Sequence, residues 1–173
     1  MEFLYNNGRI KGRSFSVTFP NEMNIQLFDA MRPAGILHFV KRSDEPFHIE
    51  IAVDKAEGRL TQKEIELYID DLGCEVDEIL PIEKDGAKGY ASFYHSSTAD
   101  YYEEWFRGND NGELFDLQFC VWTDLIDYPE ICKAIYTSGS KEEICKAFTR
   151  IPVKKILVRT EVKSFFASIK VAR

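Results

Sequence analysis

The chain has 173 residues and a mass of 20.0 kDa, and 45% of its residues are hydrophobic, 29% charged and 13% aromatic. This length suits one domain, and the composition excludes collagen, coiled-coil and globally disordered proteins. The 22 basic and 29 acidic residues give a formal net charge of −7, which excludes a generally electropositive protein that tracks phosphate. We therefore expect a single domain over residues 1–173, with 1–13 as a loosely ordered N-terminal segment, and no nucleic-acid partner.

Charge is distributed unevenly along the chain. Residues 1–140 carry 13 basic and 26 acidic side chains, whereas residues 141–173 carry 9 basic and 3 acidic ones. Either the basic segment lies against the acidic body of the same molecule, or it presents a basic face to a partner. The first interpretation is favoured, because charge runs are usually solvated faces.

The four cysteines, Cys74, Cys120, Cys132 and Cys145, include no pair with the close spacing of a zinc site or a redox motif. We expect free thiols in a reduced setting, and hence a cytoplasmic protein, unless a signal segment has been removed. No apolar run approaches the roughly 18 residues that span a bilayer, so no membrane association is expected.

The first half of the chain predicts strands and one helix. Alternating apolar and small polar residues predict a strand over 14–19 that ends before Pro20, then a short strand at 24–27. A hairpin follows, with strands at 35–41 and 47–53 around a polar turn. Thr61 and Glu64 have capping-box spacing. The apolar residues Ile65, Tyr68, Ile69 and Leu72 at i, i+3, i+4, i+7 predict one face of a helix that ends at Gly73.

Strands return over 76–82, 88–95, 100–107 and 113–123, with turns at 85–86 and at the Asn-Gly step within 109–112. The last third predicts helices at 130–136 and after Ser140, a short strand at 155–159, and a helix containing Val162, Phe165, Phe166 and Ile169. Long antiparallel hairpins with helices before, between and after them predict an α+β fold, in which helices pack on the faces of a mainly antiparallel sheet.

The chain resembles the Mog1/PsbP-like superfamily. Two features carry the resemblance: the opening strand that ends in proline, Phe15–Pro20, and the terminal amphipathic helix that runs into Ser168–Val171. The resemblance implies an antiparallel sheet sandwiched by helices. The helical segment at 129–149 departs from the family pattern and looks like extra material. The resemblance also implies a noncatalytic binding or accessory protein, because most members are of this kind, although many bacterial members have no known role. No catalytic residues are carried over from the family.

Three residues form the most testable chemical cluster. His48 and Glu50 share one face of their strand, because strand side chains alternate. A turn centred on Asp44 would pair position 38 with position 50 and bring His38 to the same face. Two imidazoles and a carboxylate can hold an open metal site if they converge within about 2.0–2.2 Å of one ion. The alternative is a polar strand face exposed to water.

Two further patterns contain residue types that functional sites use. A Cys120–His pair has the residue types of a nucleophilic site, but no flanking oxyanion-hole motif supports it. The segment 90–106 is rich in aromatic residues, and Tyr101, Tyr102 and Trp105 are favoured types for an interface. Either the sheet is buried on both faces, or one aromatic face binds a protein.

The sequence therefore predicts a noncatalytic protein-binding or accessory domain, with no cofactor, whose working surface is an aromatic sheet face or the acidic body. A protein partner or self-association is expected. The alternative is a metal-assisted hydrolase or small-ligand-binding protein that uses His38, His48 and Glu50.

Overall fold

The structure is a computed structural model that describes residues 4–6, 8–12, 14–19, 25–27, 35–42, 47–124 and 152–172. Side chains are described for 8–12, 14–19, 47–124 and 152–172. The helices expected within 129–149, together with Cys132 and Cys145, lie outside the described residues.

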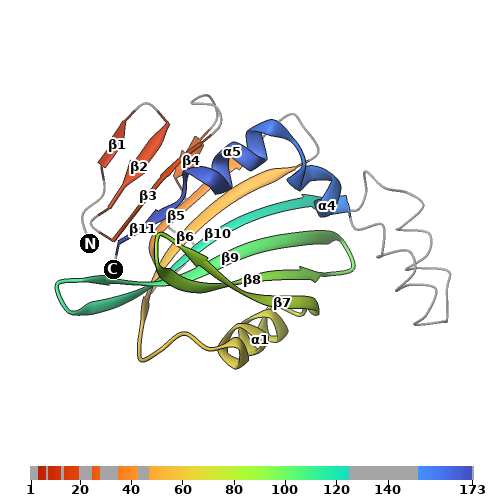
Figure 1. Ribbon diagram of the computed structural model, residues 1–173. Helices are drawn as coiled ribbons and strands as arrows, with labels where there is room; N and C mark the ends of the chain where they lie inside the picture. The colour runs from red at the N-terminus through yellow and green to blue at the C-terminus, as the bar shows by residue number, and fades with distance from the viewer. Residues whose placement is uncertain are drawn as a thin grey trace, which may run out of the picture.

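A seven-stranded sheet forms the middle of the molecule, and each strand is antiparallel to its neighbours (Figure 1). The predicted hairpins at 35–53 and 76–123 are confirmed. Across the sheet the order is β4 (Ile25–Leu27), β5 (Gly35–Arg42), β6 (His48–Ala56), β10 (Glu113–Asp124), β9 (Ala99–Asp110), β8 (Ala87–His95) and β7 (Glu75–Lys84).

A second sheet joins the two ends of the chain. Its antiparallel strands are β1 (Leu4–Asn6), β2 (Arg9–Lys11), β3 (Phe15–Thr18) and β11 (Lys170–Val171), in that order. The hydroxyl of Ser168 accepts a hydrogen bond from the backbone N–H of Thr18 at 2.9 Å, next to the β3–β11 pair. Strands β1 and β2 fall within the segment 1–13, for which the sequence predicted no element.

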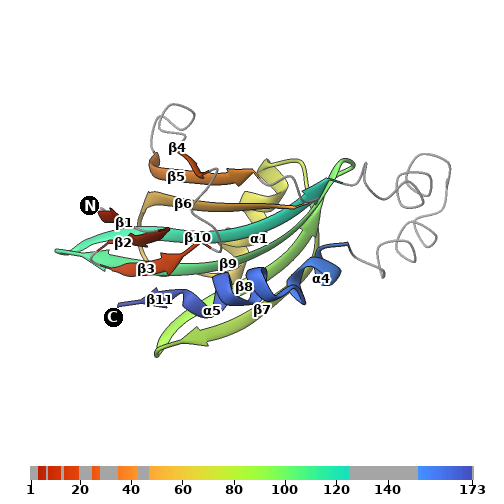
Figure 2. The ribbon, with the colours of Figure 1, turned by 90° about the horizontal axis from the view of Figure 1, so that it is seen from above.

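The elements form layers on both faces of the large sheet. The small sheet and the helices α4 (Pro152–Leu157) and α5 (Thr160–Ser168) cover one face, and helix α1 (Gln62–Asp71) covers the other (Figures 1 and 2). The predicted α+β sandwich is therefore confirmed. No helix within the described ranges is long and apolar enough to cross a membrane.

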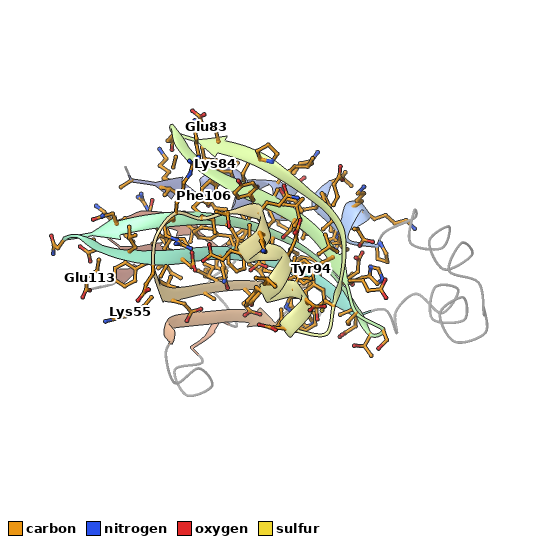
Figure 3. The ribbon with its side chains drawn as sticks, turned by 90° about the horizontal axis from the view of Figure 1, so that it is seen from below. Lys55, Glu83, Lys84, Tyr94, Phe106 and Glu113 are labelled. Carbon is orange, nitrogen blue, oxygen red and sulfur yellow. The ribbon has the colours of Figure 1, made fainter. Side chains whose placement is uncertain are left out.

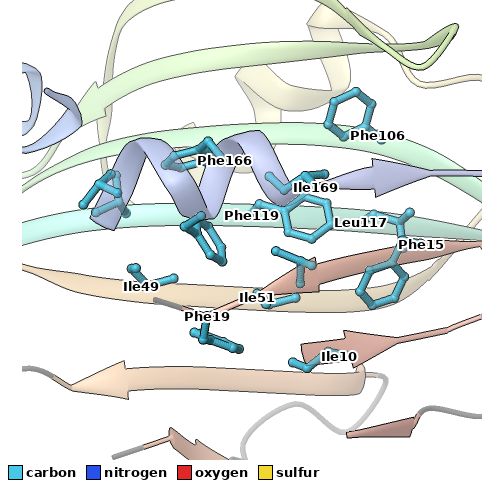
Figure 4. Packing of buried hydrophobic residues seen from close by; sticks show 14 of the residues in the cluster. Ile10, Phe15, Phe19, Ile49, Ile51, Phe106, Leu117, Phe119, Phe166 and Ile169 are labelled. Atoms are coloured by element: carbon cyan, nitrogen blue, oxygen red, sulfur yellow. The ribbon is translucent and has the colours of Figure 1, made fainter. Parts of the chain in front are cut away.

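The main core lies between the large sheet and the α5 side (Figure 4). Strand alternation sends every second residue of β6 and β10 to this face, where helix α5 and strands β2 and β3 meet them. Several of its rings pack edge to face, as Phe15 does on Phe119 with ring centroids 5.7 Å apart. Its buried members include Ile10, Phe15, Val17, Phe19, Ile49, Ile51, Val53, Phe106, Phe115, Leu117, Phe119, Val121, Val162, Phe165, Phe166 and Ile169.

Helix α1 begins and ends where its sequence predicts. The Thr61 hydroxyl accepts a hydrogen bond from the Glu64 backbone N–H at 3.3 Å, and Gly73 has the left-handed φ of +70° that ends the helix. Leu72 was expected on the apolar face, but it is 51% exposed because it follows the last helical turn.

A second, smaller core lies beneath α1. Ile65 and Ile69 are fully buried against the sheet, and Tyr68 packs edge to face on Trp105 with centroids 4.8 Å apart. Tyr94 belongs to the same cluster and lies next to α1 in Figure 3. The sheet is thus covered on both faces over β8 and β9.

The strand predicted at 155–159 is wrong, because residues 152–157 form helix α4. Val153 and Ile156 are buried at i, i+3 spacing, and Lys154 and Lys155 between them are exposed, which is a helical pattern. Pro152 stands at the first helical position, where its missing N–H costs nothing. Helix α5, predicted from the spacing of its apolar residues, is confirmed.

Gly89 of β8 is required by a close approach of neighbouring strands. A Cβ at this position would overlap the carbonyl oxygen of Trp105 and lie 2.6 Å from Cδ1 of Phe106. Gly112, in the β9–β10 turn, has a different role: it has a φ of +88°, and nothing lies within 4 Å of an added Cβ.

We expect Gly89→Ala to destabilise the protein more than Gly112→Ala. A clash with the backbone of a central strand should cost about 3 kcal/mol or more, whereas left-handed strain in an open turn costs about 1 kcal/mol. Urea unfolding of both variants measures the difference. Equal losses of unfolding free energy would contradict the close approach of β8 and β9.

Candidate functional site

The aromatic residues of β9 do not form the exposed face that the sequence suggested. Trp105 is 2% exposed because α1 and Tyr68 cover it, so it is not an exposed anchor. Tyr101 and Tyr102 are half-buried on opposite faces: Tyr101 stacks on Tyr94 at 4.7 Å, and Tyr102 packs on Phe166 at 5.0 Å. The three residues therefore share no single surface.

The predicted pairing of positions 38 and 50 is wrong by two residues. In the β5–β6 register His38 stands opposite Ala52, and Val40 stands opposite Glu50. Because Ala52 is four residues from His48 on β6, position 38 lies roughly 13 Å along the strand direction from His48. The side chain of His38 lies outside the described residues, and among the side chains that are described no group of three or more His, Cys, Asp or Glu is arranged to hold a metal ion.

His48 has neighbours of its own. Its ring lies 4.2 Å from that of Trp122, and its Nε2 is 3.8 Å from a carboxylate oxygen of Asp124. Glu50 is half-buried and stands opposite Cys120. Both side chains therefore have structural contacts within the β6–β10 strand pair.

Cys120 does not have the environment of a nucleophile. Burial, followed by the carboxylates of Glu103 and Glu50, raises its pKa well above the ordinary value for a thiol. The thiolate is the reactive form, so this cysteine stays protonated and unreactive at neutral pH. It is a free thiol that packs as a small hydrophobe, as the sequence predicted.

An acidic surface lies on α1 and the adjoining start of β7. Residues 62–78 contain seven acidic side chains and one basic side chain, a net charge of −6. Three large apolar side chains are exposed in the same stretch: Leu67 is 56% exposed, Leu72 51% and Val76 41%. The acidic body predicted from the sequence was not assigned to any element, and the local charge of this stretch is the sequence signal that locates the surface.

Two of these acidic residues oppose the stability of their own helix. Asp70 and Asp71 end α1, and the last turn of the helix contains no basic residue. A negative charge at a helix C-terminus meets the negative end of the helix dipole, which costs about 0.3–1 kcal/mol per charge. The stability of α1 therefore does not explain why acidic residues stand there.

A pocket of about 450 Å³ opens on the other face of the sheet, between α5 and the strands β7 to β9. Its walls are mainly apolar. They include Leu80 and Ile82 of β7, Ala91 and Phe93 of β8, Tyr102 and Glu104 of β9, Leu157 of α4, and Lys163 and Phe166 of α5.

The polar groups at the base of this pocket are paired with one another. The Tyr102 hydroxyl donates to Oε1 of Glu104 at 2.9 Å, and Nζ of Lys84 lies 2.5 Å from Oε2 of the same carboxylate. Lys84 also donates to the backbone carbonyl of Phe166 at 2.6 Å, which ties β7 to α5. Burial and the Glu104 carboxylate raise the pKa of Tyr102, so its hydroxyl remains a donor.

Asp100 links the sheet to helix α4. Its carboxyl is fully buried, and one oxygen accepts a hydrogen bond from the Val153 backbone N–H at 2.9 Å. Burial raises the pKa of Asp100 to about 7, and nearby Asp77 adds to the shift. His95 responds in another way: burial lowers its pKa, but the hydrogen bond to Asp77 at 3.0 Å and the negative charges of Asp77, Glu75 and Asp100 together outweigh burial and raise it.

Comparison with solved structures identifies the fold. A mutant of protein Mog1 superposes with a TM-score of 0.50 and 11% sequence identity, over 97% of this chain and 97% of that chain. The Saccharomyces cerevisiae Ran-binding protein Mog1p gives 0.49 at 10% identity, over 97% and 96%. LpqN of Mycobacterium tuberculosis, which is involved in cell envelope biogenesis, gives 0.48 at 9% identity, over 92% and 83%.

No family model matches the chain, and no curated protein matches its sequence. The comparison with Mog1 shows the fold alone, because identity is near 10%. The chain has the Mog1/PsbP-like fold, and the resemblance noted in its sequence is confirmed at that level.

We expect Asp100→Asn to change how stability depends on pH. A carboxyl whose folded pKa is about 7 and whose unfolded value is near 3.8 holds its proton longer in the folded state. Its contribution to stability is therefore present at low pH and is lost as pH rises through that window. Asparagine keeps an acceptor for Val153 and does not titrate.

The measurement is the unfolding free energy of both proteins from pH 4 to pH 8. The advantage of the variant over the native chain should grow across this range. A difference that does not vary with pH would show that Asp100 titrates at its ordinary value.

Proposed function

We propose that this protein is a noncatalytic binding domain, and that the surface formed by α1 and the start of β7 binds a basic protein partner. The observation that carries the proposal is the coincidence of two features on one surface. The acidic excess of residues 62–78 lies beside the exposed side chains of Leu67, Leu72 and Val76. Exposed apolar groups within a charged surround are typical of protein-interaction sites.

The stability argument supports the same surface. Asp70 and Asp71 stand at the unfavourable end of α1, and Leu67 points away from the core that Ile65 and Ile69 form. Residues that break a local rule of stability without a compensating contact are expected at functional sites. A basic partner would supply the missing opposite charge and would cover the exposed leucines.

The experiment is a quantitative pull-down from the native host with tagged wild-type and variant chains. In the surface variant, Asp70→Asn, Asp71→Asn and Glu75→Gln remove three negative charges. We expect at least a roughly tenfold loss of the captured partner, because complementary charges steer association and fix its register. High salt should weaken capture by the wild-type chain, since it screens exposed charges.

A matched control removes the same charge elsewhere, through Glu57→Gln, Asp85→Asn and Glu113→Gln. All three residues are exposed, and Glu113 lies away from α1 in Figure 3. The control should capture the partner as the wild-type chain does. Retention of the partner by the surface variant, or an equal loss with the control, would contradict the proposed surface.

The surface variant also carries an internal check on folding. Removing Asp70 and Asp71 relieves their repulsion from the helix dipole, so its Tm should be equal to or above that of the wild-type chain. Loss of the partner together with a lowered Tm would mean that the variant is damaged, and a single Leu67→Ser change would then test the apolar part of the surface.

A further inference from the structure

We propose that the pocket between α5 and the strands β7 to β9 binds the alkyl chain of a single-chain anionic amphiphile of the fatty-acid class, with its carboxylate held by lysines of α4 and α5. This site lies on the opposite face of the sheet from the acidic surface of α1. It is independent of the protein-binding role proposed above.

The walls of the pocket fit an alkyl chain. Leu80 is 43% exposed at the mouth although it is a large apolar residue, and Ile82, Phe93, Leu157 and Phe166 continue the apolar lining inward. A volume of about 450 Å³ lies within the range of about 300–1,000 Å³ that small-molecule sites occupy. It is at the small end of that range, which favours one alkyl chain over the two chains of a bilayer phospholipid.

The polar groups exclude a cationic ligand. Glu104 is the one carboxylate among the described residues that line the pocket, and both of its oxygens are engaged, by Tyr102 and by Lys84. Its negative charge is already balanced by the Lys84 ammonium, so it offers an amine little net attraction. The base of the pocket is closed by these contacts, so the part of a ligand that reaches it must be apolar.

Two lysines give the mouth of the pocket a positive charge. Lys163 is part of the lining, and among the described residues its ammonium has no ion-pair partner. Nζ of Lys154 lies 4.9 Å above the ring of Phe93, which is a wall of the same pocket. The described C-terminal part, 152–172, contains five basic residues and one acidic residue. A carboxylate at the mouth would receive charge-assisted hydrogen bonds from these ammonium groups.

The test is calorimetric titration of the full chain with three twelve-carbon amphiphiles, each below its micelle concentration: dodecanoate, dodecylammonium and uncharged dodecyl maltoside. We expect dodecanoate to bind roughly tenfold tighter than the other two, because it alone gains charge-assisted hydrogen bonds. Equal affinity for all three, or no binding of dodecanoate at millimolar concentration, would overturn the proposal.

Matched variants separate the two parts of the site. Lys163→Gln should weaken the binding of dodecanoate at least fivefold and leave the affinity for dodecyl maltoside unchanged. Lys170 is on the same layer but outside the pocket, so Lys170→Gln should change neither affinity. Leu80→Asp places a carboxylate at the mouth and should abolish binding of dodecanoate. Circular dichroism and the Tm of each variant show whether it is folded, and Leu80→Ser replaces Leu80→Asp if that variant is not.

A final arm separates a free amphiphile from a lipid surface. The protein is floated with vesicles of phosphatidylglycerol and, in parallel, with neutral vesicles of phosphatidylcholine. Binding of dodecanoate without flotation supports the pocket. Flotation with the anionic vesicles and no binding of dodecanoate would overturn it in favour of a basic membrane-facing surface.

Discussion

Asn111 and Gly112 close strand β9 onto β10 with φ angles of +56° and +88°, and this two-residue turn determines the register of the longest hairpin in the protein. The pair lies in the middle of the sheet and contributes buried residues to both faces. Because side chains alternate, a slip of one residue would send Phe119 to the side of α1 and Cys120 to the main core. Each of the two cores therefore depends on this turn.

The two faces that the register creates differ in chemistry. Toward α5 and the small sheet, β10 contributes Phe115, Leu117, Phe119 and Val121, and the core there is apolar and aromatic. Toward α1, the same strand contributes polar residues such as Gln118, and the apolar cluster is small. The outer layers differ in charge as well. The stretch 62–78 is strongly acidic, whereas the described part 152–172 is basic.

Because the two faces of the sheet differ in chemistry, each face suits a different kind of ligand. On the α1 side, charge and exposed leucines extend over a surface that suits a macromolecule. On the α5 side, the Lys84–Glu104–Tyr102 contacts close the base of a pocket and leave its mouth to lysines, which suits a small amphiphile. The paired carboxylate of Glu104 stabilises the contact between the sheet and helix α5. Asp70 and Asp71 instead destabilise their own helix, which makes these two residues candidates for function.

The sequence by itself determined the elements whose signals are local. The N-cap at Thr61, the left-handed stop at Gly73, the Asn-Gly turn and the apolar spacing of α5 each depend on residues a few positions apart, and all were found in the structure. The same signals were enough to give the α+β class. The predicted strand at 155–159 failed because five residues cannot distinguish strand alternation from helical spacing, and burial of Val153 and Ile156 on the sheet decided the outcome.

The candidate sites depended on tertiary structure. Trp105 is buried by helix α1, which lies about 40 residues earlier in the chain. Positions 38 and 48 are far apart because the observed β5–β6 register differs by two residues from the predicted one. The pocket combines β7 to β9 with helices α4 and α5, which begin at Pro152, far along the chain from these strands. Long-range contacts of this kind depend on how layers pack and on strand register, and neither is written in the order of neighbouring residues.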